Sequence, residues 1–467
     1  MDFSTIFKIS NVDITEEDLI PASLVTSEEA KKEYEQLTGR ELMLYSEICQ
    51  IGEKLGFNPQ NIYFLNQNKS LSTYYYYDFP VFVDIHHLSE EALEMFQIPE
   101  KIKKGTEFFN EYLSNKEYGT VISLVDSKIR ILTLKKLYPL IPDEEKYEWF
   151  LEVYTFEDYG FQQFSPELME DAFGRRPQSI KEKLKKKLDE ITQEQELVIY
   201  RAQGTESTPL DKAYSWTLSF NFASKFAGNL GMHGDVFVAK VKKENVIDYI
   251  TRRNEDEILV RPEHVYDIQD MQMVKPEEEM NRLGTYGYLY DYHRYLNELH
   301  PDLFFNPYGI HGLKHTERVL LHVQSLCLEL DVDDLDAIIL SIAALYHDIG
   351  RRNDEVDPYH GEESWKKLIE LGLIDTFEEK YEVYEDEIQI LKFIIENHCL
   401  NDELVWSNLE KLKFYRSKEE VKFLMKVFKD ADGLDRVRIG DLDTKYLRFE
   451  ESKRRYLFAK QIFREIR

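Results

Sequence analysis

Cysteine is scarce in this chain, whose 467 residues include only Cys49, Cys327 and Cys399. Their spacing provides neither a paired metal-binding motif nor a disulfide framework. Such sparse usage favours a reducing compartment, and we expect a cytoplasmic protein. The N-terminal stretch MDFSTIFKIS lacks the basic region and the long apolar core of a signal peptide, so we expect no secretion signal.

Long apolar runs and positive charge are also lacking. No stretch approaches the ~18 apolar residues that a membrane span requires, so we expect no membrane partner. Lys and Arg number 59 against 88 Asp and Glu, which gives a formal net charge of −29. So acidic a surface repels polyanions and argues against broad, unspecific nucleic-acid binding. The lysine-rich stretch at 181–190 is flanked by acidic residues, and we interpret it as a solvated helix face in preference to a nucleic-acid groove.

The remaining composition is that of a globular protein, with 43% hydrophobic and 13% aromatic residues. The length predicts two or three domains. Residues 1–120 mix helical and extended patterns, including one helix expected over 27–57 and an aromatic-rich extended segment at 72–85. We assign this part no role beyond a mixed α/β region.

The rest of the chain predicts an α+β domain followed by an all-α bundle. Residues 121–280 are helical up to about 195, and short β-branched stretches then occur at 196–204, 234–241 and 256–260. Apolar residues at helical spacing fill residues 285–467. The predicted fold class is therefore α+β, with three regions and no internal repeat.

The C-terminal half is rich in histidine, since seven of the twelve histidines fall between His300 and His398. In LYHDIG, Gly350 is a natural helix stop after the adjacent His and Asp. Any single candidate is better explained as a cap or as a helix end favoured by the dipole. The ordered set instead favours ligands that converge on a divalent cation in a bundle core. Its members are His315, His347, Asp348, His360, His398 and Asp432.

The motifs HTERV, YHDIG, YHGEES, ENH and KDADGLDR, spread over roughly residues 300–440, resemble the HD superfamily of metal-dependent phosphohydrolases. The resemblance implies His315, His347, Asp348 and Asp432 as primary metal ligands. It places His360 and His398 where two-metal members keep further ligands. One or two divalent ions (Mn, Fe, Ni, Co, Zn or Mg) and a phosphoester substrate are then expected.

Three choices stay open in this region. Asp430 competes with Asp432, and the family's pattern, not the spacing, favours Asp432. His311 competes with His315, which has the HxxRV context. Some nearby basic residues either neutralise substrate phosphate or face solvent, with nothing in the sequence to decide between the two. These are Arg351, Arg352 and Lys429.

The strand-rich middle holds a second set of candidates. Arg201 ends a predicted strand, and Glu255 and Glu257 are two apart at the entry to another, which predicts that both lie on one side. Paired carboxylates could stabilise a cationic sugar centre and activate a nucleophile, while an arginine holds a diphosphate. The alternative is a strand edge kept soluble by charge. Ser215, Thr217 and Ser219 are expected to alternate along a strand, and Phe220, Phe222 or Phe226 to stack on a base.

The order VIYRAQG, SWTLS with ASKFA, then EDEILVRP over residues 195–265 resembles the arginine–serine–glutamate class of mono-ADP-ribosyltransferases. The resemblance implies that Arg201 contacts the phosphates of NAD. It makes Ser215 the start of the hydroxyl motif, which departs from the family's Ser-Thr-Ser order. Glu257 would be the catalytic glutamate and Glu255 the upstream acid. NAD and a macromolecular acceptor, protein or nucleic acid, would be the partners.

Together these patterns predict a bifunctional enzyme, an NAD-dependent ADP-ribosyltransferase fused to an HD phosphohydrolase. Such a pairing suits a toxin or a phage-defence effector. Two rivals remain. In the first, only the HD region is catalytic, on nucleotides or nucleic acid, and the front half is a sensor. In the second, the metal site stabilises a non-enzymatic scaffold.

Overall fold

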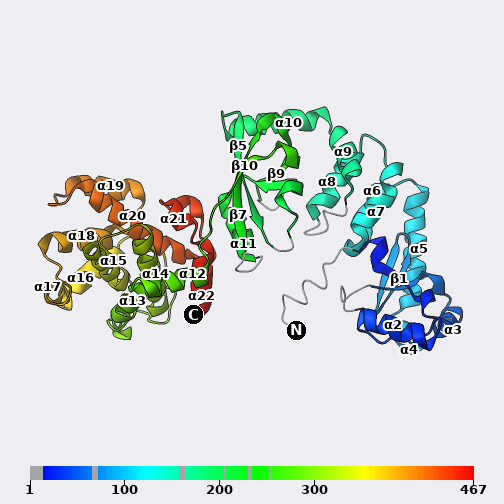
Figure 1. Cartoon of the computed structure of the whole chain (residues 1–467), viewed down its shortest axis with the longest axis horizontal. Helices are drawn as coiled ribbons and strands as arrows, with labels where there is room; N and C mark the ends of the chain where they lie inside the picture. Colours follow the sequence, from blue (N-terminus) through cyan, green and yellow to red (C-terminus); the bar gives the residue numbers. More distant parts are fainter. Residues whose placement is uncertain (1–13, 66–71, 157–163, 205–206, 230–233, 252–254) are drawn as a thin grey trace. The chain divides into compact units, whose positions relative to one another are not determined.

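The computed structural model describes residues 14–65, 72–156, 164–204, 207–229, 234–251 and 255–467. The chain forms two compact units, residues 1–187 and 188–467, whose boundary falls inside helix α10 (Gln178–Ile191) (Figure 1). The division into three domains therefore stays a prediction. Among the described residues, no helix combines the length and the apolar character needed to cross a bilayer.

The first unit contains a four-stranded antiparallel sheet with strands in chain order. Its strands are β1 (Leu19–Pro21), β2 (Ile62–Leu65), β3 (Tyr74–Asp78) and β4 (Val81–Ile85). The extended segment expected at 72–85 is the β3–β4 hairpin. The helices are α2 (Glu28–Thr38), α3 (Tyr45–Leu55), α4 (Glu90–Met95), α5 (Ile98–Ser114), α6 (Tyr118–Leu124), α7 (Arg130–Leu137), α8 (Lys146–Phe156) and α9 (Pro166–Gly174).

The single helix expected over 27–57 is wrong, because the chain forms α2 and α3 there. Gly39 ends α2 with a φ of 68°, a left-handed conformation that glycine adopts without steric cost. Five further residues separate it from the start of α3.

The second unit begins with a six-stranded antiparallel sheet in the order β10-β7-β5-β6-β9-β8. Its strands are β5 (Glu196–Gln203), β6 (Ser215–Thr217), β7 (Asp235–Lys242), β8 (Val246–Ile250), β9 (Glu257–Val260) and β10 (Tyr266–Asp270), and helix α11 (Phe220–Asn229) packs on β5. The α+β character and the three predicted strands of this region are confirmed. Thr217 on β6 lies opposite Tyr200 on β5 and opposite Glu257 on β9.

Two details of the strand prediction are wrong. Strand β6 ends at Thr217, and Ser219 caps α11 instead, because its Oγ accepts the Phe222 N–H at 3.1 Å. Strand β9 begins only at Glu257, and Asp256 before it has a φ of 48°. The two-residue alternation therefore does not extend back to Glu255.

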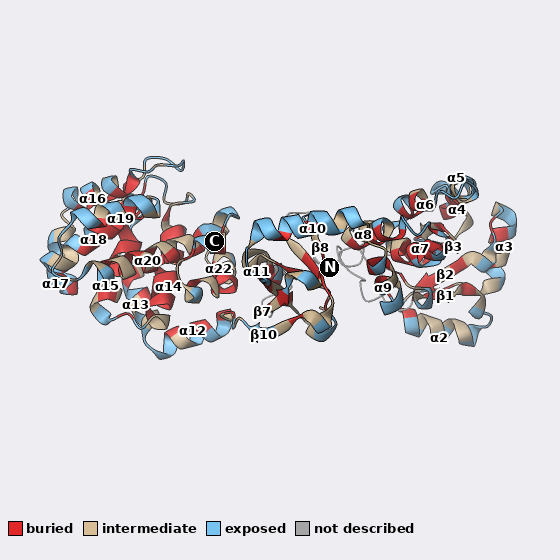
Figure 2. Ribbon diagram, turned by 90° about the horizontal axis from the view of Figure 1, so that it is seen from above, coloured by how far each residue is buried: buried red, intermediate tan, exposed pale blue. Residues whose placement is uncertain are grey.

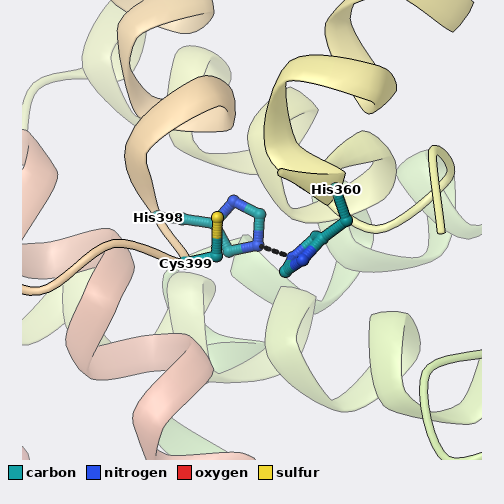
Figure 3. A group of neighbouring side chains, drawn as sticks. All are labelled: His360, His398 and Cys399. Carbon is teal, nitrogen blue, oxygen red and sulfur yellow. Dashed lines mark hydrogen bonds between the residues drawn. The ribbon is translucent and has the colours of Figure 1, made fainter. Parts of the chain in front are cut away.

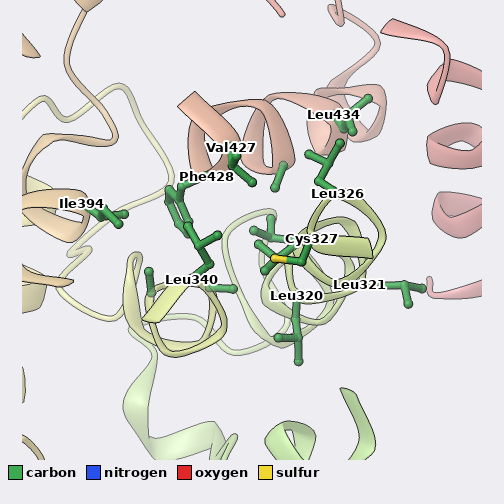
Figure 4. Packing of buried hydrophobic residues seen from close by; sticks show 14 of the residues in the cluster. Leu320, Leu321, Leu326, Cys327, Leu340, Ile394, Val427, Phe428 and Leu434 are labelled. Atoms are coloured by element: carbon green, nitrogen blue, oxygen red, sulfur yellow. The ribbon is translucent and has the colours of Figure 1, made fainter. Parts of the chain in front are cut away.

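The rest of this unit is helical, as predicted. Helices α14, α15, α18 and α20 pack together, and Figure 4 shows Leu320, Leu340, Ile394 and Phe428 from these four helices in their shared core. Figure 2 shows buried residues gathered along α14. The elements are α12 (Pro276–Thr285), α13 (Tyr288–Leu296), α14 (Leu313–Glu329), α15 (Asp334–Tyr346), α16 (His360–Glu370), α17 (Ile374–Tyr381), α18 (Glu385–Asn397), α19 (Asp402–Lys411), α20 (Lys418–Leu434), the 3-10 helix η12 (Asp435–Ile439), α21 (Glu450–Lys453) and α22 (Tyr456–Glu465).

Two glycines bring α16 close to its neighbours. A Cβ added at Gly350 would lie 2.1 Å from Ser364 N, and one added at Gly361 would lie 2.4 Å from Ile395 O. Gly350 was expected as a helix stop, but α15 has already ended at Tyr346. Gly350 instead lets the chain after α15 approach α16 closely. This approach places the end of α15, the start of α16 and the end of α18 side by side.

Candidate functional site

The six residues predicted as metal ligands come together at the ends of five helices. Five of them are at most 6% exposed, and the sixth, Asp432, is partly exposed. His315 lies in the first turn of α14, and Asp432 in the last turn of α20. The pair His347 and Asp348 follows α15, while His360 opens α16 and His398 caps α18.

The carboxylate of Asp348 lies between two groups of imidazoles. Its Oδ2 is 3.4 Å from His315 Nε2 and 3.8 Å from His347 Nε2. Its Oδ1 is 3.0 Å from His360 Nε2 and 3.6 Å from His398 Nε2. One carboxylate thus faces two potential cation positions, one on each oxygen.

Asp432 belongs to the first of these positions. Its Oδ1 lies 3.5 Å from His315 Nε2. Asp430 is directed elsewhere, because its carboxylate accepts the backbone N–H and a guanidinium N–H of Arg448 at 2.8 and 3.0 Å. His311 joins the site as well, with Nδ1 3.0 Å from Asp348 Oδ2. The structure therefore brings both His311 and His315 to the centre.

Hydrogen bonds fix the tautomers of the four buried ligand imidazoles. Each Nδ1 faces an acceptor, so Nδ1 carries the proton and Nε2 presents a lone pair to the centre. The acceptors are Asp435 Oδ2 for His315 (2.7 Å), Ala344 O for His347 (2.9 Å), Ile395 O for His398 (2.8 Å) and Asp357 O for His360.

These tautomers leave lone pairs facing one another. His360 Nε2 and His398 Nε2 are 2.8 Å apart, and His315 Nε2 and His347 Nε2 are 3.1 Å apart. Two unprotonated nitrogens cannot hydrogen-bond to each other, and each close pair therefore offers two lone pairs to a cation. Asp348 Oδ1 is buried and accepts no well-aligned hydrogen bond from a described residue, although Arg351 Nε lies 3.0 Å away, so this anionic oxygen can still coordinate a cation.

The protonation states of these side chains also favour a bound cation. Burial lowers the pKa of His347 to about 3 and also lowers the pKa of His398. Burial alone would raise the pKa of Asp348, but the imidazoles around it, His347 first, hold it well below the usual range. At neutral pH His347 and His398 are therefore neutral and Asp348 is ionised, whereas desolvation lowers the pKa of His315 but its hydrogen bonds to Asp348 and Asp435 raise it overall. Imidazole nitrogens and carboxylate oxygens together are the donor set of a borderline divalent cation such as Mn, Fe, Co, Ni or Zn.

Residues 312–437 match the HD domain family. This segment is an HD domain. The match contains all six predicted ligands and supports a metal-dependent phosphohydrolase activity and a phosphoester substrate. No curated protein and no solved structure matches the chain. Nothing in these comparisons shows an ADP-ribosyltransferase domain or a use of NAD.

Sequence reasoning missed Asp435 in the HD domain. This fully buried carboxylate accepts His315 Nδ1–H and is held by Arg318 through Nε at 2.5 Å and Nη2 at 3.0 Å. Arg318 also donates to the carbonyl of Ile466 at 2.7 Å. The available signal was helical spacing, since Asp435 follows Asp432 by three residues and Arg318 follows His315 by three.

The basic residues left open by the sequence separate into two kinds. Arg351 reaches the centre, with Nε 3.0 Å from Asp348 Oδ1. Arg352 pairs with Glu363 at the surface, and Lys429 is engaged by the Leu400 carbonyl and Asp402. Only Arg351 of the three borders the metal ligands.

Replacing Asp435 by Asn is expected to weaken metal binding and hydrolysis by about 10- to 100-fold, the usual cost of losing an outer partner of a metal-bound histidine. The amide no longer anchors the His315 Nδ1–H with a full charge, so the ring loses its fixed orientation. Calorimetric metal titration and kcat/KM measure the effect. Asp430→Asn is the matched control, because it removes an equally buried, arginine-paired carboxylate that does not contact a ligand. Equal losses in both variants would contradict a positioning role for Asp435.

In the strand-rich region, three of the predicted NAD-site residues lie on adjacent strands. Ser215 Oγ donates to Glu257 Oε1 at 2.5 Å, and Arg201 Nη1 donates to the carbonyl of Ser215 at 2.6 Å. Arg201 Nη2 also reaches the Thr208 carbonyl at 3.4 Å. The structure thus brings Arg201, Ser215 and Glu257 together at one end of the β5-β6-β9 segment of the sheet.

The other predicted members of that set have different surroundings. Thr217 Oγ1 donates to the backbone carbonyl of Glu255 at 2.6 Å and accepts the Ser219 N–H at 3.0 Å. These bonds fix the backbone around β6 and do not present a hydroxyl row. Phe226 is 43% exposed on α11, where it stacks on Phe222 with ring centroids 6.4 Å apart.

Proposed function

We propose that the HD domain hydrolyses a phosphoester with one or two divalent ions, held by His315, His347, Asp348 and Asp432 and by His360 and His398. The observation that carries the proposal is the placement of Asp348 between two pairs of imidazoles whose Nε2 lone pairs face each other. A divalent ion bound there would supply Lewis-acid activation of the ester and acidify water. The protein's own contribution is a rigid, buried donor set with fixed tautomers.

Two arginines are placed to bind the phosphate of the substrate. Arg351 Nη2 donates to His360 Nε2 at 3.4 Å, and Arg438 Nη2 lies 3.2 Å from His311 Nδ1. Both guanidinium groups therefore border the centre from different sides. Arginine suits phosphate because its planar donors can contact two oxygens at once.

The rim of the site favours a nucleotide as the substrate. The loops before α14 and before α16 are joined by Asn306 Nδ2, which donates to Asp354 Oδ2 at 3.2 Å. These loops carry Tyr308, which is 86% exposed, and Tyr359, which is 68% exposed. Aromatic side chains beside a phosphate site offer stacking surfaces for bases, each stack contributing about 1–3 kcal/mol. We therefore favour a nucleotide or a short single-stranded nucleic acid over a simple phosphomonoester.

Metal removal tests the proposed function. Metal-free protein is expected to be inactive, and Mn²⁺, Co²⁺ or Zn²⁺ should restore hydrolysis of nucleotides more strongly than hydrolysis of 4-nitrophenyl phosphate. Phosphate release and nucleotide chromatography measure the two reactions. Full activity of protein shown by elemental analysis to be metal-free would contradict the proposal. Protein that binds metal without hydrolysing any ester would favour the scaffold alternative.

A second function is supported by the hydrogen bond between Ser215 and Glu257. We propose that the group of Arg201, Ser215 and Glu257 binds and cleaves NAD and transfers ADP-ribose to a macromolecule. Glu257 would stabilise the cationic ribose centre, and Ser215 orients its carboxylate. Arg201 would contact the diphosphate, and Phe226 on α11 could stack on a ring of NAD. Both activities together would fit a cytoplasmic toxin or phage-defence effector.

A further inference from the structure

Three side chains meet where α16 begins and α18 ends. One ring nitrogen of His360, one of His398 and the Sγ of Cys399 all lie within 4.8 Å of one another. Figure 3 shows the rings of His360 and His398 facing each other, with the sulfur of Cys399 beside the His398 ring. The sulfur also donates to the carbonyl of Pro358 at 3.2 Å. Sequence reasoning gave this cysteine no function.

A thiol that merely caps the Pro358 carbonyl would explain only that one bond. It does not account for the neighbouring ring nitrogens, since His360 Nε2 and His398 Nε2 face each other at 2.8 Å with both protons on Nδ1. Oδ1 of Asp348 borders the same two nitrogens at 3.0 and 3.6 Å. Three donors at one point are what a cation needs, and the sulfur lies within 4.8 Å of a ring nitrogen of each of the two histidines.

We propose that Cys399 is a ligand of a second metal ion, which it holds together with His360, His398 and Oδ1 of Asp348. The inference rests on the proposed metal-dependent function, and it adds one metal ligand, the sulfur of Cys399, to those already proposed. When the ion binds, the thiol releases its proton to solvent and the sulfur exchanges its bond to the Pro358 carbonyl for a bond to the metal. A four-coordinate ion keeps such donors roughly 3.3–3.8 Å apart, so small side-chain rotations suffice.

This donor set makes the two positions of the centre chemically different. The first position offers nitrogen and oxygen ligands, from His315, His347 and the carboxylates of Asp348 and Asp432. It therefore accepts Mn as well as Zn, Co or Fe. The second replaces a hard donor by a thiolate, which selects Zn, Co or Fe over Mg and Mn. A mixed-metal centre follows, with the softer ion on the Cys399 side.

Cobalt(II) titration of the metal-free full chain tests the assignment. Thiolate ligation gives a charge-transfer band in the near ultraviolet, whereas any bound cobalt gives weaker visible bands. The wild type is expected to gain the ultraviolet band with the second equivalent. Cys399→Ser should lose that band and keep the visible bands of the first equivalent. Cys49→Ser, which changes a thiol on α3 in the other unit, should keep both.

The possible outcomes separate this proposal from the proposed function. Visible bands for two equivalents in the wild type without a near-ultraviolet band would overturn the role of Cys399 alone, as would a band that survives in Cys399→Ser. Protein that binds no cobalt would overturn both. Elemental analysis after mixed loading gives an independent check, because the wild type should take zinc at one position when manganese is in excess, and Cys399→Asp should lose this preference.

Discussion

Asp348→Asn is expected to lower metal-dependent hydrolysis at least about 1,000-fold. Asp348 gives one carboxylate oxygen to each group of imidazoles, so its loss removes the shared anion of both metal positions. A Lewis acid stabilises a phosphoryl transition state by several kcal/mol, and each 1.36 kcal/mol corresponds to a tenfold rate change, so losing about 4 kcal/mol gives this factor. Hydrolysis rates at saturating Mn²⁺ and bound metal by elemental analysis measure the effect.

Thermal unfolding separates loss of metal from loss of fold. Metal should raise the midpoint of the wild type, because an ion that binds only the folded state stabilises it, and should leave the midpoint of Asp348→Asn almost unchanged. Asp336→Asn is the matched control, since Asp336 is a buried carboxylate on the same chain segment, at the start of α15, where it pairs with Arg416 away from the centre. A variant at Asp348 that kept its metal and lost less than tenfold in rate would contradict the bridging role.

The convergence of the six residues proposed as metal ligands could be predicted because each lies in or beside a short, recognisable motif at a helix end. His347 and Asp348 follow a helix whose apolar pattern can be recognised from the local sequence. The helical spacing of these apolar residues predicts which face of the helix is buried. The partners that orient the ligands could not be predicted in this way. Asp435 is 120 residues from His315 and 117 from Arg318 along the chain, and only the packing of α14 against α20 and η12 joins them.

The errors in the predicted fold have local causes. Apolar periodicity continues from α2 into α3, so a helix pattern could not reveal the left-handed Gly39 between them. Ser219 has the spacing of a strand residue but the chemistry of a helix cap, and its side chain bonds to the N–H of Phe222. Asp256 adopts a positive φ that interrupts the alternation before Glu257. In each case one backbone conformation overrides a correct average pattern.

Glu257→Gln is expected to lower NAD cleavage by about 10²–10³-fold, the usual cost of removing one preorganised group that stabilises charge in a transition state. Glutamine keeps the shape and can still accept the Ser215 hydroxyl, so this part of the sheet should stay folded while the negative charge is lost. Nicotinamide release from labelled NAD measures the rate. Hydrolysis of phosphoesters by the HD domain should be unchanged, because its ligands lie on other elements.

The fate of the label decides between the remaining functions of the group of Arg201, Ser215 and Glu257. ADP-ribose attached to protein or nucleic acid supports transfer, whereas free ADP-ribose alone indicates a glycohydrolase. Glu263→Gln, an exposed change shortly after β9, controls for the loss of one charge near the sheet. Glu255→Gln tests the upstream acid, which in a transferase should lower attachment more than NAD cleavage. A wild type that consumes no NAD would instead favour a front half that senses a partner while only the HD domain is catalytic, since the hydrogen bond between Ser215 and Glu257 would then serve only to join β6 to β9.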